Sequence, residues 1–314
     1  MRPEIKEPYH AVLGFGSFIS PSAALALALL TTFLAGCATS SSAAPKKIVL
    51  VAGRISHGAG EHEFRAGALI LKQCLDQVPG VQAIVITNGW PVDPGVFQDA
   101  AAIMIYADGG DAHPFIAPER LRLLEGLMRR GVGLGAVHYG VEVPKDRGGP
   151  EFLRWIGGYF EMYHSVNPHW DANFTRFPRH PITHGVQPFK IRDEWYYHMR
   201  FPEGMKGVTP ILTDVPPDNT RGRPGELSTH GGNPDVQKHR GEPEHVMWCI
   251  ERPDGGRGFG FTGAHFHRNW GDDNFRKIML NALLWIAKVP VPKDGVQSTV
   301  SPAQLEANLD RKPK

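Results

Sequence analysis

The chain has 314 residues, of which 41% are hydrophobic and 21% charged, and its 34 Lys and Arg residues nearly balance 32 Asp and Glu residues. This composition excludes a largely disordered chain, and the near-neutral net charge argues against a binder of polyanions. Fifteen histidines stand beside only three cysteines. Because histidine binds metals and transfers protons near neutral pH, its abundance indicates a metal-binding or proton-transferring site.

The first predicted element is an export signal over residues 1–36. Residues 11–36 carry no charge and lead into the tetrad Leu-Ala-Gly-Cys at 34–37, which resembles the lipobox of bacterial lipoproteins. Cleavage before Cys37 would leave its thiol to receive lipid, followed by a flexible tether over residues 37–46. We therefore expect a protein that is exported to the bacterial cell envelope and lipid-anchored to a membrane. The alternative is a retained membrane-spanning helix.

Short apolar runs alternate with helical patterns through the next part of the chain. Strands are expected at residues 47–53, 81–87, 101–107 and 132–137, and helices at residues 61–78 and 118–128. This alternation indicates strands that are buried on both faces, so we predict a parallel sheet covered by helices. In such sheets, ligands bind beyond the carboxyl ends of the strands.

The second half is less regular, and we expect it to complete and extend the same sheet. Strands are predicted at residues 171–177, 208–213, 245–251 and 258–262, and helices at 151–160 and 272–289. Residues 214–244 have almost no large apolar side chains, which is typical of a lid, a binding loop or a disordered insertion. Residues 291–314 are assigned to a C-terminal tail. Cys74 and Cys249 are expected to be buried and inert, with a disulfide between them as the alternative.

The most informative segment ends the strand at residues 132–137. It leads into His138, with Ala136 two residues before and Gly140 two residues after. Small residues at these positions are typical of a nucleophile elbow, a tight turn between a strand and a helix in which larger side chains would collide. His138 should therefore stand at the carboxyl edge of the sheet.

Four motifs together resemble the trehalose-utilisation (ThuA-like) family, a branch of the class I glutamine amidotransferase-like fold. They are the elbow, His-Pro-Ile-Thr at 180–183, Asp-Glu-Trp-Tyr at 193–196 and Gly-Ala-His at 263–265. The resemblance implies a flavodoxin-like three-layer α/β sandwich with a mostly parallel sheet, a ThuA-like domain over residues 47–290, and a role in the metabolism of trehalose or keto-disaccharides. Amidotransferases of this fold carry a cysteine at the elbow. Because histidine cannot form their thioester, glutamine hydrolysis is not expected.

Residues from separate strand ends are expected to meet near His138. His57 follows the first strand and should reach the same edge of the sheet. His265 and His267 point to one face of the last strand and could ligate one ion, and the resemblance favours His265. It also places Glu194 at the pocket. The predicted catalytic residues are His138, Glu194 and His57.

A divalent metal such as zinc is expected to be held by His57, His138 and His265, where it would activate water or polarise a carbonyl. Proton transfer by the same groups without a metal is the alternative. His62 and Glu63 are explained equally well by a solvated polar turn at the start of a helix.

The expected substrate is a small-molecule carbohydrate, turned over by hydrolysis, elimination or isomerisation. Asp108 lies in an edge loop, and Tyr139 and Trp195 could contact a sugar through their rings. The sequence has no phosphate-binding loop and no basic stripe, so nucleotides and nucleic acids are not expected as partners. Two further alternatives are a non-catalytic sugar-binding lipoprotein and a component of a surface complex.

Overall fold

A computed structural model describes residues 44–312. The predicted export signal, Cys37 and most of the predicted tether lie outside these residues. Within the described part, the chain forms one compact α/β unit. Every helix among residues 44–312 is too short or too polar to cross a bilayer.

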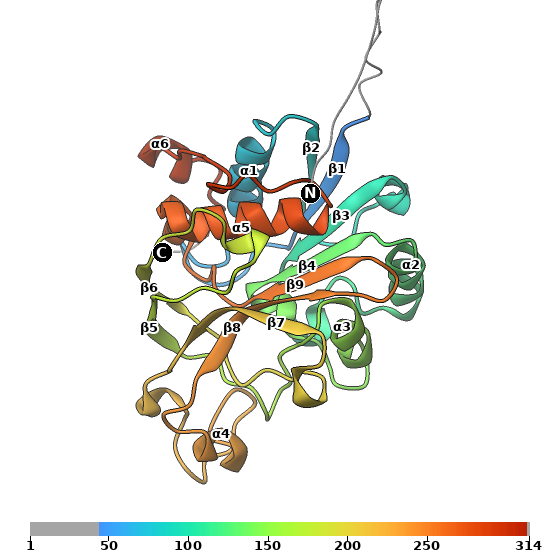
Figure 1. The fold of residues 1–314 in the computed structure, drawn as a ribbon. Coiled ribbons are helices and arrows are strands. Elements are labelled where there is room, and N and C mark those ends of the chain that lie inside the picture. Colours follow the sequence, from blue (N-terminus) through green and yellow to red (C-terminus); the bar gives the residue numbers. More distant parts are fainter. Residues whose placement is uncertain (1–43, 313–314) are drawn as a thin grey trace, which may run out of the picture. The chain divides into compact units, whose positions relative to one another are not determined.

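A seven-stranded sheet organises the domain, in the order β2-β1-β3-β4-β9-β8-β7 (Figure 1). Its strands are β1 (Lys46–Ala52), β2 (Val81–Ile86), β3 (Ala100–Tyr106), β4 (Gly133–Val137), β7 (Val208–Asp214), β8 (Glu244–Glu251) and β9 (Arg257–Phe261). The five strands from β2 to β9 are parallel, whereas β8 and β7 run antiparallel to their neighbours. The predicted mostly parallel sheet is confirmed.

Helices cover both faces of this sheet, which gives the predicted three layers. The helices are α1 (Phe64–Leu75), α2 (Pro118–Arg129), α3 (Gly149–Trp155) and α5 (Asp273–Ile286), with two short helices, α4 (Pro234–Lys238) and α6 (Pro302–Leu305). Successive residues of β1 point to opposite faces. Leu50 therefore packs in the core under α1 and α5, and Val51 packs in the core under α2 and α3.

One expectation about the second half is wrong, because the strand predicted at residues 171–177 does not join the main sheet. It is β5 (His169–Phe174), which pairs only with β6 (Phe189–Glu194) in a separate antiparallel ribbon. In β5, exposed side chains alternate with the buried Trp170, Ala172 and Phe174. This pattern suits a ribbon with one wet face, not the interior of a sheet that is covered on both faces.

The C-terminal segment, residues 291–312, packs against the domain. Val296 is buried in the core under α1 and α5. Further on, Arg65 of α1 donates a 2.7 Å hydrogen bond to the carbonyl oxygen of Asn308. Lys312 ends the described chain with its ammonium 3.3 Å from the Glu63 carboxylate, and both side chains are only 1% exposed. The segment is therefore part of the folded unit.

The two cysteines of the described part are buried and free. Burial raises the pKa of both thiols, and for Cys249 the pKa reaches about 12. A thiol that stays protonated is a poor nucleophile, so Cys74 and Cys249 are inert at neutral pH, as expected.

Candidate metal centre

Four side chains from distant parts of the chain converge at the carboxyl edge of the sheet. His62 lies just before α1, His138 follows β4, Glu194 ends β6, and His265 follows β9. The three histidines are buried and Glu194 is nearly so. Each offers one atom to the group, namely Nε2 of His62 and His138, Nδ1 of His265 and Oε2 of Glu194.

The distances between these atoms are those of a metal coordination shell. His62 Nε2 lies 3.0 Å from His138 Nε2 and 3.1 Å from His265 Nδ1. His138 Nε2 and His265 Nδ1 are 3.3 Å apart. Glu194 Oε2 lies 3.0 Å from His265 Nδ1 and 3.4 Å from His138 Nε2. Tetrahedral zinc with bonds of about 2.0–2.1 Å requires ligand atoms about 3.3–3.4 Å apart, so an ion fits among the four atoms.

The hydrogen bonds behind the rings decide which nitrogens can bind an ion. His138 Nδ1 lies 2.8 Å from the carbonyl oxygen of Thr262, which can only accept, so this nitrogen carries the proton. His62 Nδ1 lies 3.1 Å from the Asp108 carboxylate and donates in the same way. Both Nε2 atoms therefore present lone pairs to each other. Such an arrangement is repulsive unless a cation lies between them, and carboxylate–histidine pairs of this kind commonly orient metal ligands.

A second carboxylate holds the loop that carries His265. Asp193 is fully buried and accepts hydrogen bonds from the backbone N–H groups of Ala264, at 2.7 Å, and His265, at 3.0 Å. Asn269 donates a further bond of 2.9 Å to the same side chain. The neighbouring Glu194 is steadied by a 3.1 Å bond from the Asn167 amide. Asp193 therefore holds the backbone of the loop that carries His265, and its neighbour Glu194 directs its carboxylate toward the other three proposed ligands.

Strained backbone conformations gather at this place. His57, His62, His138 and Ala264 all have φ between 44° and 85°, a left-handed region that costs free energy for residues other than glycine. His138 makes the predicted elbow, since β4 ends at Val137 and the chain bends at once. A Cβ at Gly140 would approach the carbonyl oxygen of Ile105 to 3.1 Å, so a small residue is favoured there. Strain of this kind typically persists where a site requires it.

The electrostatics favour the protonation states that metal binding needs. Burial lowers the pKa of His62 far below its usual value, so its imidazole is neutral. Burial alone would raise the pKa of Glu194, but its contacts with His138 and His265 hold that pKa well below its usual range, and the contact with Glu194 raises the pKa of His265. A neutral His62 and an ionised Glu194 are ligand forms that bind divalent metals, whereas His265 would release its proton when an ion binds.

The structure brings three of the predicted site residues together and places the fourth beside them. His138, Glu194 and His265 join the group, whereas His57 lies outside it and has ligand atoms within reach of His62 and Asp108 instead. Its ring stacks on His62 at a centroid distance of 3.5 Å, its side chain is 40% exposed, and its Nδ1 lies 3.1 Å from Ser56 Oγ. His62 takes the position that sequence analysis gave to His57.

The other predicted residues have varied positions. His267 lies apart from the group, with Nε2 bonded at 2.8 Å to the carbonyl oxygen of Leu305. Asp108 supports His62, and Tyr139 is partly exposed, with its ring 6.0 Å from that of His62. The prediction that Trp195 contacts a sugar is wrong. Its side chain is fully buried and packs against the rings of Phe174, Phe261 and Phe275.

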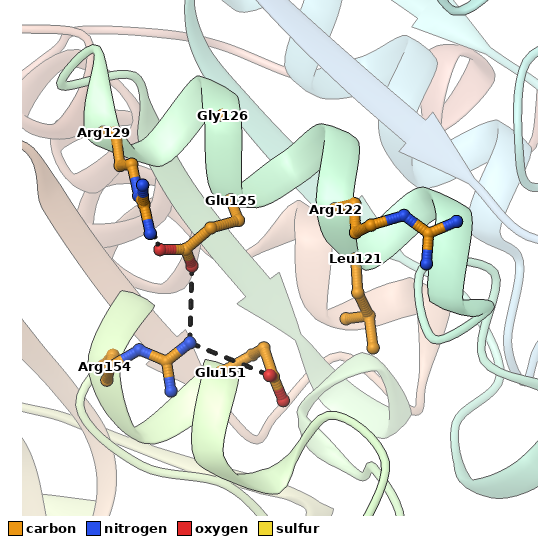
Figure 2. Close-up of a pocket in the computed structure, with 7 residues that line it drawn as sticks. All are labelled: Leu121, Arg122, Glu125, Gly126, Arg129, Glu151 and Arg154. Carbon is orange, nitrogen blue, oxygen red and sulfur yellow. Dashed lines mark hydrogen bonds and ion pairs between the residues drawn. The ribbon is translucent and has the colours of Figure 1, made fainter.

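Two cavities differ in what they offer a ligand. One of about 330 Å³ lies at the carboxyl ends of β1 and β3 and is lined by Arg54, Trp90 and Asp108, among others. Because Asp108 also touches His62, this cavity adjoins the four-residue group. The other, of about 450 Å³, lies between α2 and α3 (Figure 2). Its Glu125 is already paired with Arg129 and Arg154, which explains those charges without a ligand.

Comparisons with known proteins agree with this architecture. A family model described as ThuA, trehalose utilisation, matches residues 62–286. Comparison with curated proteins gives no match. Among solved structures, the chain is similar to a ThuA-like protein from Bacteroides uniformis ATCC 8492, with 16% identity and a TM-score of 0.54 over 78% of this chain and 92% of that one. A ThuA-like protein from Parabacteroides merdae ATCC 43184 has 15% identity and a TM-score of 0.49 over 82% of this chain and 94% of that one.

Proposed function

This chain belongs to the ThuA (trehalose utilisation) family, and from that premise we propose that it is a metal-dependent enzyme acting on a carbohydrate or keto-sugar. The metal ligands in this proposal are His62, His138, Glu194 and His265. The observation that carries it is the spacing of 3.0–3.4 Å between their inward-facing atoms. A cluster of buried imidazoles held together without a cation would be unfavourable.

The donor set indicates the kind of metal. Three imidazoles and one carboxylate suit zinc, and they also suit manganese or iron, because imidazole and carboxylate are intermediate and hard ligands. When bound, such an ion supplies Lewis-acid chemistry, which polarises a sugar carbonyl or activates a water molecule. Both abilities serve the hydrolysis, elimination or isomerisation of a carbohydrate.

The protein's own groups then orient the ligands and the substrate. Asp108 and the carbonyl oxygen of Thr262 hold the rings of His62 and His138 in the required tautomers. The Tyr196 hydroxyl lies 3.3 Å from Glu194 Oε2, and burial raises its pKa well above the usual value, so it remains a hydrogen-bond donor to the carboxylate. His57 is more exposed than the proposed ligands and is placed to hydrogen-bond a sugar hydroxyl.

The cavity beside Asp108 supports a carbohydrate as the substrate class. It combines an aromatic side chain, Trp90, with the donors of Arg54 and Asn88. Sugar-binding sites use this combination, since apolar sugar faces pack on rings and hydroxyl groups pair with polar side chains. Tyr139 is a further candidate for sugar contact. Burial raises its pKa to about 12, so its phenol stays protonated and can donate.

The proposed location rests on the N-terminal sequence. The uncharged stretch and the lipobox-like tetrad before Cys37 favour export and lipid anchoring in the bacterial cell envelope. Mass spectrometry of the N-terminal peptide after expression in a bacterium tests this part. A diacylated Cys37 is expected, whereas an unprocessed Met1 would contradict it.

The function is tested with the purified full chain, by metal analysis and by assays on trehalose and 3-keto-disaccharides. The wild type should bind one metal ion per chain at this centre and lose turnover on chelation. His138→Ala should lower turnover by more than about 100-fold, since losing a ligand exceeds the effect of losing the residue that orients one. His184→Ala is the matched control, because this histidine is outside the group and its ring bonds through Nδ1 to the carbonyl oxygen of Pro292 at 3.1 Å.

Two results would contradict the proposal. Full turnover in His138→Ala would remove the metal centre from the mechanism. Sugar binding without conversion, together with absence of metal from the purified protein, would support a non-catalytic sugar-binding lipoprotein instead.

A further inference from the structure

A second group of metal-binding side chains lies outside the centre described above. His164 precedes β5, His198 follows β6, and Asp235 lies on α4. One ligand atom from each lies within 4.8 Å of the other two. Asp235 Oδ2 is the common neighbour, at 3.2 Å from His198 Nε2 and 3.9 Å from His164 Nδ1.

A buried carboxylate orients His198 toward this group. Glu244, at the start of β8, lies with Oε1 3.3 Å from His198 Nδ1, and its Oε2 accepts a 3.0 Å bond from the His198 backbone N–H. His198 Nε2 lies 3.2 Å from Asp235 Oδ2, and a divalent ion between these atoms would displace the proton that they share, while the Glu244 contact at Nδ1 keeps the ring oriented. It is the same carboxylate–histidine arrangement that supports metal ligands. Glu244 therefore fixes the orientation of the His198 ring, which a histidine exposed at the surface would not have.

The nearby arginines both contact carboxylates, although Nη2 of the buried Arg221 has no hydrogen-bond partner among residues 44–312. Arg200 donates two 3.0 Å hydrogen bonds to the Glu161 carboxylate. Arg221 lies 3.4 Å from Asp218 and 3.9 Å from Glu244. A third imidazole lies nearby, since the ring centroids of His239 and His198 are 4.9 Å apart.

We propose that His164, His198 and Asp235 form a second divalent-metal site, one that fastens residues 215–243 to the rest of the domain. Asp235 belongs to this segment, whereas both histidines belong to loops beside the β5–β6 ribbon. An ion shared among them links the two. The donor set of two imidazoles and one carboxylate suits zinc, with water completing the shell. The role is structural, because the ion would join a residue of α4 to residues of two other loops.

A metal ion at this second site would also hold residues 215–243 near the first metal centre. Residues 215–243 also carry His230, whose Nε2 lies 3.3 Å from Oε2 of the buried Glu142, four residues after His138. The carbonyl oxygen of Thr229 accepts a 2.7 Å bond from the Tyr163 backbone N–H. Fastening α4 at one end therefore holds His230 in place at the other.

The proposal is tested with the purified full chain, stripped of metal and titrated with zinc alone. Calorimetry and elemental analysis should find two zinc ions per chain in the wild type. His198→Ala should weaken only the second site by at least ~10-fold, and His62→Ala only the first. His184→Ala should retain both. Because each site has its own variant, failure of one proposal leaves the other measurable.

A second variant and a second measurement guard against misfolding of His198→Ala. Asp235 is half exposed, so Asp235→Asn removes a ligand with little disturbance to packing. Trypsin cleavage after Arg221, Lys238 and Arg240 reports whether residues 215–243 are held against the domain. Zinc should slow cleavage in the wild type and not in Asp235→Asn. One zinc ion that is lost only in His62→Ala, with cleavage unaffected by zinc, would show that the cluster is an ion-pair network and overturn the proposal.

Discussion

His62 Nε2 lies 3.0 Å from His138 Nε2, although 76 residues separate the two histidines in the sequence. Each ring uses its other nitrogen to donate to an oxygen, of Asp108 in one case and of Thr262 in the other. Two unprotonated nitrogens thus face each other inside the protein. The proposed cation would explain this contact, and the same ion would explain the approach of Glu194 and His265.

Replacing the two neighbouring histidines separately should distinguish a metal ligand from a substrate contact. His62→Ala should abolish zinc binding at the first centre, because it removes one of four ligands. His57→Ala should leave zinc binding within about 3-fold of the wild type, since its ring lies outside the group. Isothermal titration with zinc measures both. A reversed outcome would return the ligand role to His57.

The carboxylate behind His62 should tune metal affinity. Asp108→Asn weakens the acceptor for His62 Nδ1 and should lower zinc affinity by about 10–100-fold, without removing a ligand. Asp111→Asn is the matched control, since Asp111 is exposed and pairs with Arg147. Equal affinities in the two variants would show that Asp108 does not act through His62.

Protonation of His113 should contribute to loss of stability in acid. This histidine bonds to the carbonyl oxygen of Gly140 and accepts from the Phe115 backbone N–H, and burial lowers its pKa to about 4. Between about pH 6.5 and 4 the unfolded chain binds a proton that the folded chain does not, so stability falls as pH falls through this window, by about 1.4 kcal/mol per unit.

The comparison with His113→Gln isolates that effect. Glutamine does not titrate, so the difference between the free energies of unfolding of wild type and variant should shrink as pH falls from 6.5 to 4. Urea unfolding at several pH values measures it, and contributions from other histidines cancel in the difference. Parallel curves for the two proteins would refute the assignment.

The C-terminal segment should stabilise the loop that carries His62. Lys312 contacts the carbonyl oxygens of Glu61 and His62 and neutralises the buried Glu63. Lys312→Met leaves that carboxylate without its partner and should cost about 3 kcal/mol, which Lys312→Met combined with Glu63→Gln should partly restore. Urea unfolding provides the measurement. A cost below about 0.5 kcal/mol for the single variant would mean that Lys312 is not docked.

Much of the fold was predictable because the relevant patterns are local. The apolar runs gave β1, β2, β3 and β4, and the small residues around His138 predicted its tight bend. The assignment of β5 to the main sheet was wrong because strand pairing is not a local property of the sequence. Whether a short strand joins one sheet or another depends on partners far away in the sequence, and only the alternation of buried residues in β5 signalled a separate ribbon.

The choice between His57 and His62 could not be made from spacing. Both lie in one loop between β1 and α1, and each adopts a left-handed conformation that turns its side chain in a direction sequence does not reveal. The one signal in the sequence was that His62 lies closer to the start of α1 than His57 does. The contact that distinguishes the two in the structure is made by the next residue, Glu63, which is buried and bound by the C-terminal segment. That contact spans 247 residues and was invisible before the fold was known.

The central claim is that four side chains hold one metal ion. A crystal of the full chain grown with zinc, with diffraction recorded on both sides of the zinc absorption edge, tests it directly. An anomalous peak is expected about 2.0–2.2 Å from His62 Nε2, His138 Nε2, His265 Nδ1 and Glu194 Oε2. Absence of a peak there, with the four atoms still in contact, would contradict the account.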